Sequence, residues 1–149
     1  MKIIVDSNII FSALLKYTGS IGDLLFNSED LFSFSAPQFL QQEIEDHWSK
    51  LRSISKLSEE ELRQSQFRIY QRIEFHDEKL ISSRLWLSSE SLVKEIDIDD
   101  VAFVALARHL RGMLWSGDRT LVLGLRKAGY TKVITTQELL AIRRDLREG

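Results

Sequence analysis

The sequence predicts an α/β protein whose central parallel sheet is covered by helices on both faces. Short apolar runs rich in β-branched residues alternate along the chain with longer stretches that have helical patterns. Most of these runs are apolar at consecutive positions, as expected for strands buried on both faces of a parallel sheet. In such sheets ligands bind beyond the carboxyl ends of the strands. The residues that follow each strand are therefore the first candidates for a functional site.

The expected strands are short and carry β-branched or aromatic side chains, which suit a pleated, buried surface. KIIV ends at Asp6, and MLWS ends shortly before Asp118. LFSFS and KVIT are the other two runs of this kind. The expected strands cover residues 2–5, 31–35, 113–116 and 132–135.

The expected helices follow one another with few breaks, since the chain has one proline and seven glycines. Pro37 suits the first turn of a helix. Ser58 with Glu61 three residues later forms a capping-box pattern. The stretch 101–110 is apolar on nearly every side, which predicts a central, buried helix. The expected helices cover residues 8–16, 21–27, 37–51, 58–73, 84–95, 101–110, 119–129 and 137–148.

Composition indicates one domain of ordinary size. The 149 residues suit a single domain spanning 1–149, with 44% apolar residues for a core and 28% charged residues for a surface. A net charge of −2 argues against a protein that coats nucleic acid, although a local patch would still permit a nucleic-acid enzyme. The absence of cysteine excludes disulfides, thiolate metal sites and a cysteine nucleophile.

The sequence shows no membrane or export signal. No apolar run reaches the ~18 residues of a membrane span. The first residues, MKIIVD, also lack the basic and apolar regions of a signal peptide. We therefore expect a cytoplasmic protein without a membrane anchor.

Acidic residues occur where the predicted strands end. Asp6 ends the first strand, and Asp118 follows the MLWS strand by two residues. Because the carboxyl ends of parallel strands meet at one edge of the sheet, both are expected in the same crevice. Glu43 lies one to two turns into the helix that follows the LFSFS strand, and it is expected near the same edge.

The stretch KEIDIDDVAFVALA adds three aspartates directly before the most apolar helix. Asp97 and Asp100 are three residues apart at a helix start, which predicts that they share one face. Asp99, ~100° from Asp100 around the helix, is expected to point elsewhere. Negative charge is favourable at the positive end of a helix. Asp97 and Asp100 are also placed to converge with the acidic residues of the sheet edge.

Such a cluster favours a divalent cation. Carboxylates within ~4–6 Å raise one another's pKa values, because each disfavours the charge of the next. Mg²⁺ or Mn²⁺ removes this penalty and takes carboxylate and water oxygens at ~2.1 Å. The ion lowers the pKa of a coordinated water and stabilises charge on a phosphate during in-line attack. A site of carboxylates alone favours phosphodiester hydrolysis over zinc peptidase chemistry.

Each candidate also has an ordinary structural interpretation. Asp6, Asp97 and Asp118 could simply cap the helices that follow them, and the chain has 22 acidic residues, so no single one is decisive. Asn8 and Ser116 could hold a metal-bound water or steady a carboxylate, or could make only a cap or turn hydrogen bond. The combined order of strand-end, helical and helix-start acids is what favours a shared site.

Taken in order, several motifs resemble those of PIN domains. They are DSNII at 6–10, APQFLQQEI at 36–44, DIDDVAFVALA at 97–107 and WSGDRTL at 115–121. The similarity extends from Met1 to about Leu140 and is greatest to single-domain PIN proteins of bacteria and archaea, among them VapC-type toxins. The resemblance implies a three-layer α/β/α sandwich with a central parallel sheet, and metal-dependent cleavage of single-stranded RNA. Residues 1–149 would form one PIN-like domain.

The resemblance also implies roles for individual residues. The family's acidic residues fall on Asp6, Glu43, Asp100 and Asp118, which would hold Mg²⁺ or Mn²⁺ directly, through water or by completing the charge. Asp97 matches an additional aspartate that some branches carry and is a further candidate ligand. The family's small polar residues fall on Asn8 and Ser116.

Single-stranded RNA is the expected substrate, because the site would have to admit an unpaired backbone. Candidate phosphate contacts are Lys16, Arg119 and Arg126, each of which could instead be a solvated surface charge. An antitoxin protein is the partner expected of a toxin. PIN relatives often form homodimers. The candidate interface residues, which could equally belong to the core, are Phe67, Tyr70, Leu85 and Trp86.

Other families with a strand-end aspartate fit less well. Haloacid dehalogenase phosphotransfer resembles D-x-D chemistry, and Asn8 stands where the second aspartate is needed. Response-regulator receiver domains need an acidic pair at the first strand end, where Ser7 follows Asp6. The alternative to a nuclease is a catalytically inactive PIN-like module that binds RNA or a protein without cutting.

Overall fold

A computed structural model describes residues 1–16 and 18–149, which include a parallel five-stranded sheet in the order β3-β2-β1-β4-β5. The central strand β1 pairs with β2 through Ile3 and Phe34, and with β4 through Ile3 and Met113. Parallel pairing brings the carboxyl ends of all these strands to one edge. The strands are β1 (Lys2–Val5), β2 (Ser33–Pro37), β3 (Ile73–His76), β4 (Met113–Trp115) and β5 (Val133–Ile134).

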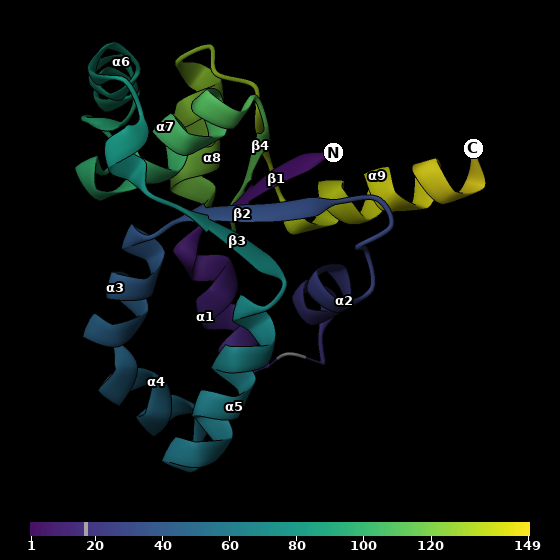
Figure 1. The fold of residues 1–149 in the computed structure, drawn as a ribbon. Helices are drawn as coiled ribbons and strands as arrows, with labels where there is room; N and C mark the ends of the chain where they lie inside the picture. The colour runs from purple at the N-terminus through teal and green to yellow at the C-terminus, as the bar shows by residue number, and fades with distance from the viewer. Residues whose placement is uncertain (17) are drawn as a thin grey trace.

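Helices cover both faces of the sheet, so the predicted α/β/α sandwich is confirmed (Figure 1). Helices α6, α7 and α8 lie on one side, and α1, α3, α4 and α5 lie on the other. Helix α2 packs against α9. The helices are α1 (Ser7–Leu15), α2 (Ser20–Phe26), α3 (Phe39–Asp46), α4 (Trp48–Ser55), α5 (Glu59–Tyr70), α6 (Ser83–Val93), α7 (Val101–Leu110), α8 (Arg119–Lys127) and α9 (Thr136–Glu148), with 3₁₀ turns η1 (Glu78–Leu80) and η2 (Ile98–Asp100).

The core lies between the sheet and these helices. As the sequence predicts, α7 is central: it packs on β1, β2 and β4, and every residue from 102 to 107 is buried. Trp115 of β4 is fully buried, with its ring 5.8 Å from that of Phe34 and its Nε1 donating to Thr136 Oγ1. Burying a large apolar side chain stabilises a fold by ~1.5–3 kcal/mol. The sheet is thereby fixed against α7 and the start of α9.

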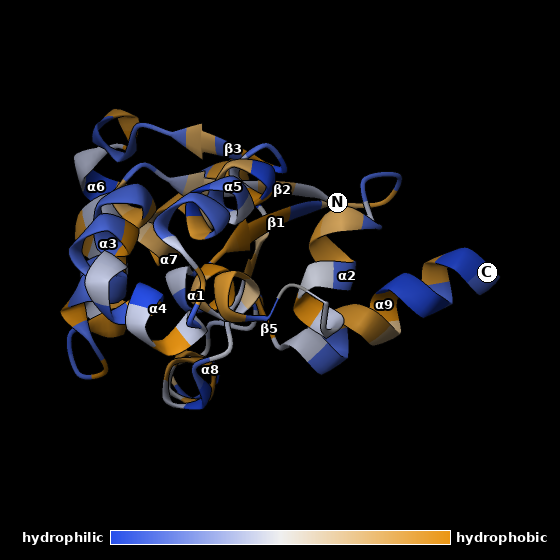
Figure 2. Ribbon diagram, turned by 90° about the horizontal axis from the view of Figure 1, so that it is seen from below, coloured by the Kyte–Doolittle hydropathy of each residue, from blue (hydrophilic) through white to orange (hydrophobic). Residues whose placement is uncertain are grey.

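The last helix changes in polarity along its length: its first turn is polar, residues 139–142 are apolar and its end is charged. In Figure 2 the apolar stretch lies beside α2, whereas the hydrophilic end projects from the body of the molecule. Arg143 of α9 pairs with Asp23 of α2 and donates to Ser28. These contacts attach α9 to the rest of the fold far from the carboxyl edge of the sheet.

The structure around Pro37, at the end of β2 and the start of α3, differs from the sequence-based prediction. β2 spans Ser33–Pro37 instead of 31–35, so Pro37 ends a strand and does not open a helix. The missing N–H of proline is tolerated there because β1 pairs with β2 only as far as Ser35. The helix predicted over 37–51 is two helices, α3 and α4, which are separated at His47.

Strand β3 is absent from the prediction, in which a helix continues to Ile73. The predicted capping box is confirmed, with Glu61 N donating to Ser58 Oγ and Ser58 N donating to the Glu61 carboxylate. Helix α5 nevertheless ends at Tyr70, and the chain pairs with β2 from Ile73 onward. No glycine or proline marks this change, so tertiary pairing with β2 decides it.

Among residues 1–16 and 18–149, no helix by itself is long and apolar enough to cross a membrane. Helices α1 and α2 reach that length and apolarity only as a bent pair.

The residues predicted for a homodimer interface differ in exposure. Phe67 is 65% exposed, whereas Tyr70, Leu85 and Trp86 are partly buried against the core. The homodimer stays a prediction.

Candidate metal centre

Asp6 is the buried anchor of the carboxyl edge. Asp6 is only 2% exposed to solvent. Its backbone N donates to Trp115 O at 3.0 Å and so connects the ends of β1 and β4. Oδ1 accepts from Ser7 N at 2.8 Å and so caps α1. Oδ2 accepts from Ser116 Oγ at 2.7 Å and from Asn8 Nδ2 at 3.2 Å. The capping role and the place in the acidic site therefore coincide in one side chain.

Asn8 and Ser116 connect Asp6 to the loop that follows β4. Ser116 Oγ accepts from Asp118 N at 3.0 Å, and Asn8 Oδ1 accepts from Gly117 N at 3.0 Å. Asp118 Oδ1 in turn caps α8 by accepting from the N–H groups of Thr120 and Leu121. The network holds both strand-end carboxylates in fixed positions. Asn8 and Ser116 thus steady carboxylates, as one of the sequence-based interpretations proposes.

Glu43 and Asp100 reach the edge from opposite layers of the sandwich. Glu43 lies on α3, and Asp100 ends η2 directly before α7. Glu43 Oε1 and Asp100 Oδ2 are buried and accept no hydrogen bond from the described residues. A buried acceptor without a donor is costly. Such oxygens indicate a place where a cation or a proton is needed.

The electrostatics join these carboxylates into one cluster. Burial raises the pKa of Asp100 to about 8, and the neighbouring carboxylates raise it further. Burial likewise raises the pKa of Glu43 to about 7 and that of Asp6 to about 6, with hydrogen bonds from serine side chains opposing the rise. The carboxylates that act on Asp100 are those of Asp6, Asp97, Asp118 and Glu43.

Asp97 and Asp99 border this cluster. Asp97 is exposed and caps η2, its Oδ1 accepting from Asp99 N at 3.0 Å. Three residues make one turn of a 3₁₀ helix, so Asp97 and Asp100 share a face, and the charge of Asp97 raises the pKa of Asp100. The charge of Asp99 raises the pKa of Glu43. Asp99 is exposed and is not among the groups that chiefly raise the pKa of Asp100, so the expectation that its side chain points elsewhere stays a prediction.

The chemistry of these groups fits a hard divalent cation, since the donors are all oxygens and two of them lack hydrogen bonds. Within residues 1–16 and 18–149, no three acidic or histidine side chains form a preassembled set of ligands. Coordination of one ion would therefore need side chains to rotate. Glu43 and Asp100 would rotate most, because Glu43 Oε1 and Asp100 Oδ2 accept no hydrogen bond from the described residues. The metal ligands stay a prediction.

The predicted phosphate contacts differ in their surroundings. Arg126 donates to both Glu138 oxygens and to Val133 O, so its charge is already paired. Lys16 is exposed at the end of α1. Arg119 is exposed at the start of α8 and lines a hollow of about 470 Å³ that reaches Ser116. Of the three, Arg119 combines exposure with proximity to the acidic cluster.

Fold and site together define a parallel α/β/α protein with a carboxylate cluster at the carboxyl edge of its sheet. The sequence profile described as PIN domain matches residues 4–142, and the chain therefore belongs to the PIN domain family. This assignment accounts for the order of the motifs around Asp6, Glu43, Asp100 and Asp118.

Similar solved structures show the same fold. One is a chain of VapBC2 from Rickettsia felis bound to a DNA fragment from its promoter, with 14% identity and a TM-score of 0.68 over 91% of this chain and 97% of that one. Another is a chain of a toxin-antitoxin complex from Klebsiella pneumoniae, with 14% identity and a TM-score of 0.57. The match covers 89% of this chain and 96% of that one. A search of curated proteins gives no significant match.

The raised pKa values predict how stability depends on pH. Asp6, Glu43 and Asp100 have pKa values of about 6, 7 and 8 in the folded protein, against 3.8, 4.5 and 3.8 ordinarily. The folded state therefore binds more protons than the unfolded state across this range. Without metal, the contribution of these three groups to the free energy of unfolding should be complete below pH ~4 and should be lost as the pH rises through their folded-state pKa values to ~8.

Urea denaturation in a chelating buffer, repeated between pH ~4 and ~8, measures how the free energy of unfolding changes with pH. Asp100→Asn should flatten this dependence, because the group with the largest rise no longer titrates. Glu74→Gln, which alters an exposed carboxylate of β3, controls for the loss of one charge. A metal-free protein that gains stability as the pH rises would contradict the assigned burial of these groups.

Proposed function

We propose that the protein is a Mg²⁺- or Mn²⁺-dependent endoribonuclease that cleaves single-stranded RNA. The observation that carries this proposal is the cluster of carboxyl groups at the sheet edge, in which Glu43 Oε1 and Asp100 Oδ2 are buried without a donor. Membership of the PIN domain family supports nuclease chemistry at this edge. The resemblance of the motifs implies that Asp6, Glu43, Asp100 and Asp118 carry the family's acidic roles, which supports the proposal.

Each carboxylate of the cluster would have a role that follows from its hydrogen bonds. Asp6 and Asp118 are fixed by the Ser116 and Asn8 network and would give the ion stationary oxygens. Asp100 would hold the metal with them, directly or through water, and Glu43 would complete the charge. When bound, the metal would supply an acidified water and stabilise charge on the phosphate. Glu43, whose buried Oε1 accepts no hydrogen bond from the described part of the chain, would accept a proton there from the attacking water.

The hollow beside Ser116 supports an RNA substrate. It is lined by the exposed Arg119 and by the polar side chains of Thr136 and Gln137, and it begins where β4 and β5 end. A strand that places its scissile phosphate at the carboxylates would lay its next phosphates toward Arg119. The exposed Arg119 would contact these phosphates, as basic side chains do in proteins that hold an unpaired backbone.

The same proposal includes a protein partner. Both solved neighbours described above come from toxin-antitoxin complexes, which supports the toxin of such a pair as the role of this chain. An apolar hollow of about 240 Å³ between α1 and α4 offers a docking surface. Leu15 and Ile54 at its rim are 39% and 54% exposed, and exposed apolar patches mark interaction sites. We propose that an apolar segment of the antitoxin binds there.

Metal binding is the first prediction of the proposed function. Mn²⁺ should raise the melting temperature of the wild-type protein, because a ligand that binds only the folded state stabilises it. Asp6→Asn should remove most of this rise, since it removes the negative charge and replaces one of the two anchored oxygens with an NH₂ group. Differential scanning fluorimetry with and without Mn²⁺ measures it, with Glu74→Gln as the control. An equal rise in wild type and Asp6→Asn would place the ion elsewhere.

Cleavage is the second prediction. The wild-type protein should cut a single-stranded RNA in the presence of Mn²⁺, and Asp118→Asn should slow the cutting by at least ~100-fold, as loss of a charge-stabilising group does. Asp118→Asn keeps a side chain that can cap α8, so its melting temperature should stay close to that of wild type. Undiminished cutting by this variant would indicate a contaminating nuclease. Binding of RNA by wild type without cutting would favour the inactive module.

The antitoxin groove gives a third prediction. Ile54→Asp should weaken binding of the protein encoded by a neighbouring gene by at least ~10-fold, because a charge would be buried in an apolar contact. Calorimetric titration measures this affinity, and Ser55→Asp supplies a control at the adjacent position of α4. Unchanged affinity would reject the groove. Failure of any neighbouring gene product to bind wild type would count against the toxin role.

A further inference from the structure

Within the described chain, residues 1–16 and 18–149, the buried side-chain oxygens without a hydrogen bond are Glu43 Oε1, Asp100 Oδ2 and Glu78 Oε2. The first two belong to the acidic cluster. Glu78 lies on η1, two residues after the end of β3, and does not act on the pKa values of the cluster. Its unpaired oxygen therefore needs a separate explanation.

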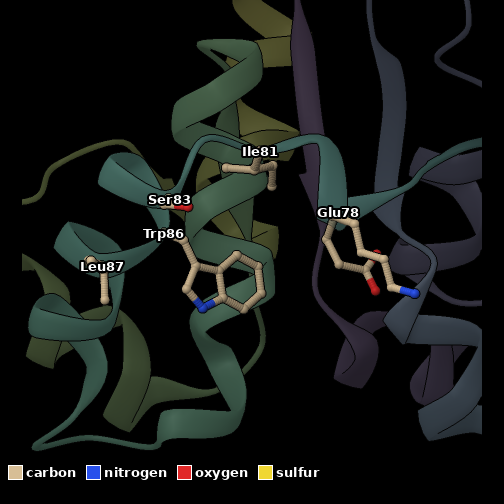
Figure 3. Close-up of a pocket in the computed structure, with 6 residues that line it drawn as sticks. Glu78, Ile81, Ser83, Trp86 and Leu87 are labelled. Carbon is tan, nitrogen blue, oxygen red and sulfur yellow. The ribbon is translucent and has the colours of Figure 1, made fainter.

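Glu78 lines a hollow of about 420 Å³ between η1 and α6. In Figure 3 the indole of Trp86 lies on one side of this hollow and the carboxylate of Glu78 on the other, with Ile81 between them along the connecting chain. Trp86 is only partly buried, so its ring is available to a ligand. The remaining lining residues are Lys79, Ser83 and Leu87.

The walls of the hollow define the ligand chemically. An indole face stacks on planar groups. Oε2 of Glu78 is buried and accepts no hydrogen bond from the residues that the structure describes. A rotation of the side chain would turn both carboxylate oxygens into the hollow, where they would accept two parallel N–H bonds, as carboxylates do in strong pairs with planar donors. A ligand that satisfies both walls is flat and carries two adjacent N–H groups on one edge. Among the bases of RNA, guanine carries this pair at N1 and N2, whereas the others place an acceptor beside their donor.

The position of the hollow connects it to the acidic cluster. η1 leaves the carboxyl end of β3, and β3 is two strands from β1, which corresponds to ~10 Å along the sheet edge. Gln38 N donates to His76 O, so this end of β3 is joined to the start of α3, the helix of Glu43. On its other side α6 packs against α7 and contacts η2, which carries Asp100. An RNA strand lying on this edge passes both sites.

We propose that the hollow binds the guanine base of a nucleotide next to the cleaved bond, with the base stacked on Trp86 and its N1–H and N2–H donating to Glu78. The proposal rests on the proposed ribonuclease function. An arginine side chain of a protein partner presents similar donors. Lys79 lines the same hollow, and its charge repels a guanidinium but attracts the phosphate of a nucleotide. The hollow therefore favours a nucleotide.

Tryptophan fluorescence tests the site without metal or cleavage. Trp48 and Trp115 are 8% and 0% exposed, so quenching by an added nucleotide reports on Trp86. In a chelating buffer, GMP should quench the wild-type protein, and AMP and IMP should bind at least ~10-fold more weakly, since IMP lacks the N2 donor and AMP lacks both the N1 and the N2 donor. Glu78→Gln should weaken GMP binding by a similar factor. Glu74→Gln, an exposed carboxylate of the same segment, should leave it unchanged.

Equal quenching by the three nucleotides, or none at millimolar GMP, overturns the proposal. Stronger quenching by N-acetylargininamide than by GMP also overturns it and assigns the hollow to a protein partner. With Mn²⁺ and a mixed-sequence RNA, wild type should show guanine enriched at one position beside the cut, and Glu78→Gln should lose this enrichment. Cutting without GMP binding rejects the guanine site alone. GMP binding without cutting rejects the nuclease and leaves a guanine-binding hollow.

Discussion

The burial of one carboxylate, Asp6, is the constraint on which the carboxyl edge of this sheet depends. A buried charge is tolerated only when its oxygens are satisfied, and both oxygens of Asp6 accept hydrogen bonds. Ser7 N comes from the start of α1, and Ser116 Oγ from the loop after β4, 110 residues away in the chain. The same bonds therefore fix strand, helix and loop relative to one another. Burial also raises the pKa of Asp6, so the arrangement costs stability at neutral pH.

Structural and functional roles coincide at this edge. Asp6 caps α1, Asp97 caps η2 and Asp118 caps α8, yet all of them contribute charge to one region. For Asp6 and Asp118 the parallel topology explains why, because their strand ends are followed by helix starts that need a capping acceptor. Asp97 instead reaches this region from the segment between α6 and η2. Glu43 and Asp100 differ: each has a buried oxygen that no described group satisfies. The carboxylates that cap helices are held in place by hydrogen bonds. The unpaired oxygens of Glu43 and Asp100 are the ones that a bound cation would satisfy.

Much of this arrangement follows from local sequence, and the rest depends on tertiary pairing. The strand-end positions of Asp6 and Asp118, the Ser58 capping box and the buried α7 follow from apolar patterns and capping residues. Strand β3 was not predictable in this way, because it continues a helical pattern without a breaker and forms by pairing with β2. Pro37 was misassigned because its tolerance depends on where β1 stops pairing. Glu78 carries no motif, and only its unpaired oxygen reveals it.

The fold gathers these acids at the carboxyl edge of the sheet, where we propose that they take up a divalent cation. Anomalous diffraction from a crystal grown with Mn²⁺ would locate this ion. We expect an anomalous peak at the carboxyl edge with oxygens of Asp6, Asp100 and Asp118 around it, and rotated side chains of Asp100 and Glu43. A fully occupied manganese ion bound elsewhere, with this edge empty and its side chains unmoved, would rule out the proposed metal centre.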